Sequence, residues 1–107
     1  MAKKAGKRQF QEKIIDDTFL LKRPRRGAKL REEVWQTADG KVTKYNLAYI
    51  NHLVCRVDNV RVLGYDNQHD HHHRHFMGHA EPFKYAGYDV LMDRFLAEVE
   101  VLRKETR

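Results

Sequence analysis

The residues of this 107-residue chain that are best suited to chemistry are histidines gathered in one segment. Six of its seven histidines lie between His69 and His79, directly after Tyr65-Asp66-Asn67 and around Arg74. Imidazoles beside a cation and a carboxylate suit proton transfer, metal ligation or anion binding, because histidine changes charge near neutral pH. A purification tag would not be internal and interrupted by other side chains. A solvated polar loop is the alternative interpretation.

One reaction open to such a segment is cleavage of an RNA phosphodiester without a metal ion or other cofactor. The reaction needs a base for the 2′-hydroxyl, an acid for the departing 5′-oxygen and a cation for the charged phosphorane. Two histidines could supply the base and the acid, and Arg61 or Arg74 could hold the phosphate. Tyr65 could be an alternative acid or a platform for base stacking. Asp66 could orient an imidazole or simply cap the turn into the loop.

Metal binding is the second chemistry that the segment allows. On an extended chain, alternate side chains share a face, which places His72 and Arg74 opposite the odd-numbered histidines. His71, His73 and His75 then form a possible ligand set for a divalent transition metal, with Asp70 or Glu81 as a carboxylate ligand. No HExxH or CxxC motif accompanies them.

The positive charge of the chain, formally +6, is concentrated near the N-terminus. Residues 1–31 hold eleven lysines and arginines against three acids, whereas residues 32–107 hold ten against twelve. A basic stretch attracts phosphates through counterion release, which favours a nucleic-acid partner. A solvated tail that only aids solubility is the alternative.

Cys55 is the only cysteine, so no internal disulfide is expected. Its apolar neighbours predict a buried thiol, which suits a reducing cytoplasm. We find neither an export signal nor a run of apolar residues long enough to span a membrane.

The local patterns predict two hairpins. Residues 10–21 fit either a loose helix or a first strand, and residues 29–37 and 41–51 read as strands joined by Ala38-Asp39-Gly40. A second hairpin is expected around a two-residue Asp58-Asn59 turn, with Arg56 and Arg61 facing each other on one side of the sheet. The full register pairs Val57 with Val60, Arg56 with Arg61, Cys55 with Val62, Val54 with Leu63 and His52 with Tyr65.

The C-terminal segment has the spacing of an amphipathic helix, with Asp89 as its expected N-cap. Hairpins followed by one such helix predict an α+β fold, a small antiparallel sheet covered on one face by the helix. We therefore expect a flexible basic tail over residues 1–12 and a single domain over residues 13–107. The apolar stripe expected to face the core is Leu91, Met92, Phe95, Leu96, Val99 and Leu102.

The order of these motifs resembles the TumE-type toxins of bacterial toxin-antitoxin pairs over about residues 29–104. Glu33-Val34-Trp35 is similar to an acidic and aromatic strand start near the front of that family. The passage from Tyr65-Asp66-Asn67 to His72-His73-Arg74-His75 is the most specific part. The extra histidines His71 and His79 and the basic leader depart from the family pattern. The remaining shared segments are Tyr45-Asn46-Leu47-Ala48-Tyr49, Arg61-Val62-Leu63-Gly64, His69 and Glu81-Pro82.

The resemblance implies an endoribonuclease neutralised by an antitoxin with a helix-turn-helix domain, with a homodimer as a further possibility. A non-catalytic module that binds nucleic acid or a transition metal is the competing interpretation. The candidate catalytic residues are His69, His73, His75, Arg74, Tyr65 and Asp66, and the candidate substrate-binding residues are Arg56, Arg61 and Asn67.

Overall fold

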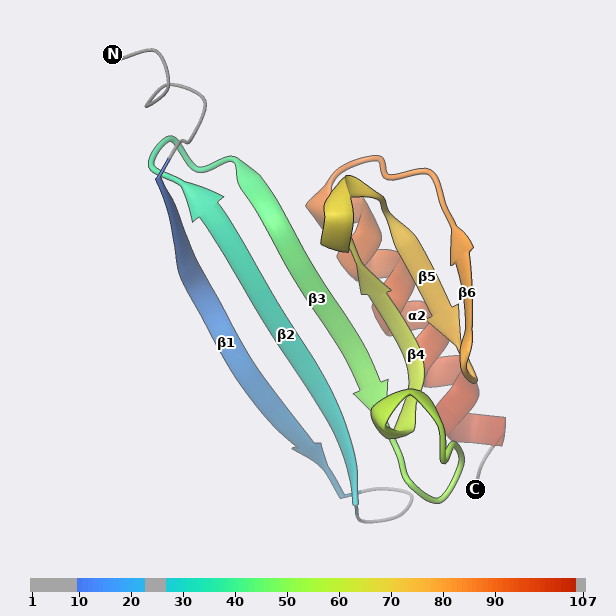
Figure 1. The fold of residues 1–107 in the computed structure, drawn as a ribbon. Coiled ribbons are helices and arrows are strands. Elements are labelled where there is room, and N and C mark those ends of the chain that lie inside the picture. The colour runs from blue at the N-terminus through green and yellow to red at the C-terminus, as the bar shows by residue number, and fades with distance from the viewer. Residues whose placement is uncertain (1–9, 23–26, 106–107) are drawn as a thin grey trace.

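A computed structural model describes residues 10–22 and 27–105, which form an antiparallel sheet and one long helix (Figure 1). Every strand pairs with the next along the chain, in the order β1-β2-β3-β4-β5-β6. This arrangement confirms the predicted α+β fold. The elements are β1 Gln11–Leu21, β2 Ala28–Thr37, β3 Val42–Ile50, η1 Asp58–Val60, β4 Arg61–Asp66, η2 Gln68–Asp70, β5 His73–Phe76, β6 His79–Pro82 and α2 Tyr88–Glu105.

Residues 10–21 contain a strand, which resolves the two alternatives left by the sequence. β1 pairs with β2 from Gln11 to Leu21, interrupted by one register shift between Lys13 and Ile15. Its β-branched and aromatic side chains suit a pleated surface, and pairing with β2 outweighs the weak helical spacing. Most of the predicted tail, residues 1–12, lies outside the described residues, as does the segment 23–26 with its three arginines.

The predicted hairpin of residues 29–51 is confirmed, with β2 and β3 joined by the expected turn. The Gly40 N–H donates to the Thr37 carbonyl over 2.9 Å. Gly40 has a φ of +89°, a conformation that residues with a Cβ rarely adopt. The segment Ala38-Asp39-Gly40 therefore predicted the position of this turn correctly.

The predicted register around Asp58-Asn59 is wrong, because residues 51–60 form a loop instead of a strand. Leu47 and Tyr49 of β3 take the places opposite Tyr65 and Leu63. The Asn51 carbonyl accepts the N–H groups of residues 54 and 55 over 3.1 and 3.0 Å, and its side chain accepts the residue 53 N–H over 3.0 Å. These local bonds compete with strand pairing. Arg56 therefore does not face Arg61, and His52 does not face Tyr65.

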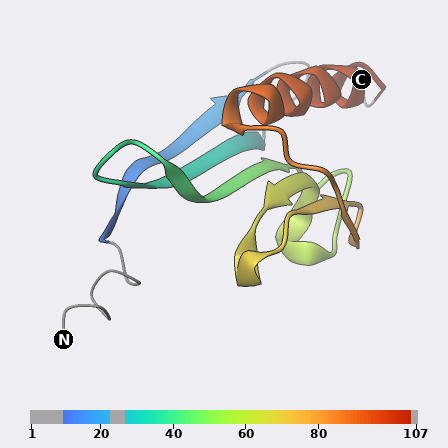
Figure 2. The same ribbon diagram turned by 90° about the horizontal axis from the view of Figure 1, so that it is seen from above.

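Alternation along the strands divides the sheet into two faces. We call the face against α2 the helix face and the opposite one the open face; Figure 2 shows α2 on one side of the sheet only. Cross-strand partners share a face, so the register assigns each side chain. The helix face carries Val34, Tyr45, Leu47, Tyr49, Leu63, Tyr65 and Arg74, and the open face carries Arg31, Glu33, Trp35, Asn46, Ala48, Gly64, Asp66, His73 and His75.

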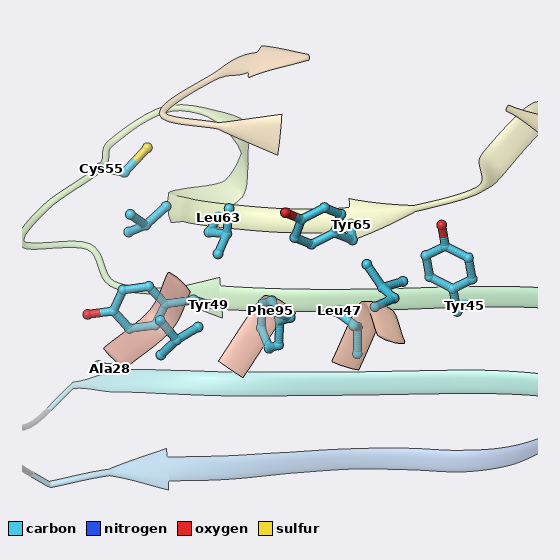
Figure 3. Packing of buried hydrophobic residues seen from close by; sticks show 11 residues of the cluster. Ala28, Tyr45, Leu47, Tyr49, Cys55, Leu63, Tyr65 and Phe95 are labelled. Atoms are coloured by element: carbon cyan, nitrogen blue, oxygen red, sulfur yellow. The ribbon is translucent and has the colours of Figure 1, made fainter. Parts of the chain in front are cut away.

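The core lies between the helix face and α2 (Figure 3). Phe95 is 2% exposed and meets the Tyr65 ring edge-on at 6.3 Å between centroids. Leu91 and Val99 are buried on the same side of the helix, as predicted. The Cys55 thiol, in the loop of residues 51–60, is buried as well, as predicted. Leu96, predicted to face the core, is 46% exposed instead. Asp89 lies in the first turn of α2 and not at its N-cap, because the helix begins at Tyr88.

We expect Phe95→Ala to lower the free energy of unfolding by about 3–5 kcal/mol, because it removes a buried ring and leaves a cavity. The matched control is Leu96→Ala, because Leu96 is the next residue along α2 and lies on its exposed side. This substitution should change the free energy of unfolding by less than about 0.5 kcal/mol. Urea denaturation measures both values. Equal losses would contradict the packing described here.

Candidate functional site

A cavity of about 590 Å³ lies on the open face, bordered by strands β2 to β6 and the segments η1 and η2. Several of the side chains that the sequence singled out meet here, although they come from separate parts of the chain. The lining side chains that can carry charge or transfer protons include Asp58, Arg61, Asp66, His69, His73 and His75.

Small residues give the cavity its depth. One cross-strand row of the open face contains three small residues. In order across the strands the row is Arg31, Ala48, Gly64, His75 and Ala80. At Gly64 an added Cβ would overlap the Arg61 side chain, which lies across this strand. The absence of a side chain at Gly64 therefore allows Arg61 to lie over the floor of the cavity.

Arg61 is held by two carboxylates. Its Nε and Nη2 atoms donate to the Asp58 carboxylate over 2.9 and 3.1 Å, and its Nη1 atom donates to Asp66 Oδ2 over 3.3 Å. The Asp66 side chain is only 8% exposed, so its charge needs such a partner. The guanidinium thereby fixes both carboxylates beside the histidines.

Both ring nitrogens of His75 face carboxylate oxygens. Nε2 lies 3.1 Å from Asp66 Oδ2, and Nδ1 lies 3.9 Å from Asp58 Oδ2. Nε2 is buried, and despite the short distance its orientation does not meet hydrogen-bond geometry. The sequence left two roles open for Asp66: its Oδ1 accepts the Gln68 N–H over 3.4 Å, as a cap of the turn would, and its Oδ2 lies where it could orient the imidazole.

His73 continues the row of imidazoles along β5. Its ring centroid lies 6.2 Å from that of His75 and 6.1 Å from that of His71. His69 lines the same cavity but is exposed and has a φ of +60°, so it belongs to a turn and not to the strand. Within residues 10–22 and 27–105, no three His, Cys, Asp or Glu side chains converge as a metal site would require.

His72 points the other way, as alternation predicts, and packs among aromatic rings. Its Nδ1 lies 2.7 Å from the Tyr45 hydroxyl, and its ring stacks on Tyr85 at 4.3 Å. Burial lowers the pKa of His72, and the nearby His73 lowers it further. His72 therefore has a packing role and does not border the cavity.

Tyr65 and Arg74 also lie on the helix face, away from the cavity. Tyr65 is fully buried and donates to Glu98 of α2, and burial raises the pKa of its hydroxyl to about 12, with Glu98 adding to the shift. Arg74 donates to the Tyr65 hydroxyl over 3.1 Å, to Glu98 over 2.9 Å and to Glu81 over 3.3 Å. The sheet thus separates this pair from His73 and His75.

The other two candidates for substrate binding lie outside the cavity lining. Asn67 joins two strands, since its Oδ1 accepts the Tyr45 N–H over 3.0 Å and its Nδ2 donates to the Thr43 carbonyl over 2.9 Å. Arg56 is exposed in the loop of residues 51–60. Sequence reasoning missed Arg31 and Asn46 and gave Asp58 only a turn role. The alternation of polar residues in β2 and β3 was the signal for the first two.

The comparison with protein families identifies the chain. The profile described as Toxin TumE matches residues 26–103. The chain belongs to the TumE toxin family. Membership confirms the resemblance that the motifs suggested, and a toxin of this kind implies an antitoxin partner. Searches of curated proteins and of solved structures gave no significant match. In the part of the chain that the structure describes, no helix has the length and apolar character needed to cross a membrane.

The partly buried position of His72 predicts a pH-dependent stability. The unfolded chain takes up a proton at His72 below about pH 6.5, whereas the folded chain resists protonation until a lower pH. The free energy of unfolding should therefore fall as pH decreases through that window. The variant His72→Gln should lose this pH-dependent part of the free energy of unfolding. The control His79→Gln, at an exposed position, should retain it. Denaturation at several pH values measures the slopes, and an unchanged slope in His72→Gln would contradict the assignment.

Proposed function

We propose that this TumE family member is a toxin that cleaves RNA by metal-independent acid-base chemistry in the open-face cavity. The observation that carries the proposal is the pair of imidazoles, His73 and His75, 6.2 Å apart beside Asp66 and Arg61. A hydrogen bond reaches about 2.6–3.2 Å, so one phosphodiester group placed between the rings could contact both. Such a toxin would act in the cytoplasm, where its RNA substrates are, and we expect its antitoxin to carry a helix-turn-helix domain.

The two histidines have complementary tasks in the proposed reaction. One neutral imidazole takes the proton of the 2′-hydroxyl, and the 2′-oxygen then forms a bond to phosphorus. The bond from phosphorus to the 5′-oxygen breaks, and the other histidine, as imidazolium, donates its proton to that oxygen. The products are a 2′,3′-cyclic phosphate and a 5′-hydroxyl. Asp66 orients His75 and stabilises the charge that an imidazole gains.

Arg61 is the arginine best placed to hold the phosphate. A guanidinium has five N–H donors, and three of them are used by Asp58 and Asp66. The two remaining donors are available to the equatorial oxygens of the phosphorane. Because two carboxylates already offset its charge, Arg61 contributes directed hydrogen bonds more than net positive charge. His69 at the rim can supply a further proton-bearing group.

The test is cleavage of a short RNA by the full chain in EDTA. We expect His73→Ala and His75→Ala each to slow cleavage by on the order of 10²- to 10⁴-fold, since each removes one proton-transfer group. His79→Ala is the matched control, because His79 is exposed on β6 and does not line the cavity. Its rate should match that of the parent chain.

Thermal melting of each variant separates lost chemistry from lost folding, and His75→Gln supplies a second, closer replacement. Full activity in folded His73 and His75 variants would refute the proposed roles. Loss of activity in EDTA, restored by a transition metal, would favour the metal alternative. RNA binding without cleavage by the parent chain would favour the non-catalytic module.

A further inference from the structure

A second group of open-face side chains lies next to the cavity and has no role in the chemistry above. Lys13 of β1, Trp35 of β2 and Lys44 of β3 are cross-strand partners in one row. The Lys13 and Lys44 Nζ atoms lie 5.0 and 4.7 Å from the centroid of the Trp35 ring. Trp35 is partly exposed and is the only tryptophan of the chain. We call these three residues the tryptophan row.

The two lysines differ in their charge environment. Lys13 Nζ lies 2.9 Å from both Asp16 and Glu33, so two carboxylates offset its charge. Lys44 makes no ion pair with any residue in the described ranges 10–22 and 27–105. The tryptophan row therefore presents one aromatic ring beside one ammonium group whose charge is not compensated locally.

Asn46 connects the tryptophan row to the cavity. It lines the cavity and lies two residues along β3 from Lys44, a separation of about 7 Å on a strand. Its Nδ2 donates to Glu33 over 2.8 Å, but its Oδ1 is buried and has no hydrogen-bond partner among the described residues. A buried acceptor without a donor is uncommon and costly. The exocyclic amino group of a nucleobase would supply that donor once the Asn46 side chain turns its Oδ1 toward the cavity that the residue lines.

We infer that the tryptophan row and Asn46 form a subsite for one nucleotide of single-stranded RNA, adjacent to the cleavage site. The base stacks on Trp35, its amino edge donates to Asn46 Oδ1 and its phosphate binds Lys44. Base stacking on an aromatic ring is stronger than an exposed cation-π contact, so the base displaces a lysine from the ring face. The path of the RNA strand from this subsite to His73 rests on the proposed function.

The sole tryptophan makes the subsite directly observable. The probe is a short 2′-O-methyl RNA, which lacks the 2′-hydroxyl nucleophile and so reports binding without cleavage. We expect saturable quenching of Trp35 fluorescence, equal in the parent chain and in His79→Ala, whose histidine does not line the cavity. Trp35→Ala should weaken binding by about 5- to 150-fold, measured by anisotropy of a labelled probe. Trp35→Phe, which keeps a ring, should lose less and guards against a folding defect.

The lysines provide matched variants. Lys44→Ala should weaken binding and reduce the slope of log K against log salt by about 0.7, the value for one phosphate contact on a single strand. Lys13→Ala should change the slope less, because Lys13 is already paired. Lys104→Ala makes the same charge change on α2, on the other side of the sheet, and should leave the quenching unchanged.

Five outcomes are decisive. RNA binding without quenching, or equal effects of Lys44→Ala and Lys104→Ala, would overturn the subsite. Quenching by the antitoxin but not by RNA would assign the surface to a protein partner and overturn it too. Quenching by RNA in a chain that cleaves no RNA would support the subsite and refute the proposed reaction. Cleavage without quenching would refute the subsite alone.

Discussion

The packing of α2 against one face of the sheet determines which side chains of the histidine segment lie beside the helix and which lie on the open face. Phe95 and its neighbours on α2 bury the helix face, and strand alternation then directs every second residue of β4 and β5 into that core. Tyr65 is thereby buried and Arg74 is held beside it on the helix face, with Glu98 as their shared partner. Asp66, His73 and His75 are left on the open face. One hydrophobic interaction thus separates residues that are adjacent in the sequence.

Charge pairing shapes the open face in turn. Asp66 is nearly buried, and Arg61 supplies the cation that such a carboxylate requires. Gly64 leaves room for that guanidinium, and Asp58 at the turn holds its other edge. The carboxylates of Asp58 and Asp66 are thereby fixed beside His75 before any substrate arrives, and fixed positions are the condition under which the proposed acid-base groups would be effective. The same face continues past Asn46 to Trp35 and Lys44, so the proposed nucleotide subsite and the proposed cleavage site would share one surface of the sheet.

The sequence predicted the elements whose signals are local and failed where a local signal conflicted with pairing. Alternation in residues 29–51 and the helical spacing after Tyr88 gave the hairpin and the helix. The Asp58-Asn59 turn was interpreted as the turn of a hairpin. Hydrogen bonds to Asn51 instead make residues 51–60 a loop, and β4 pairs with β3. That error also misplaced Arg56. Tyr65 and Arg74 were grouped with the histidines by proximity in the sequence, although strand alternation had already placed Arg74 on the face opposite His73 and His75. The resemblance identified the toxin family, and the register was needed to locate the cavity.

The most direct test of this account is the chemistry of the RNA ends that the full chain produces in EDTA. Attack by the neighbouring 2′-oxygen, assisted by His73 and His75, predicts a 2′,3′-cyclic phosphate on one fragment and a 5′-hydroxyl on the other. A substrate with a single 2′-O-methyl group at the cleaved position should resist cleavage there. Fragments ending in a 3′-hydroxyl and a 5′-phosphate, or cleavage at the blocked position, would contradict the account.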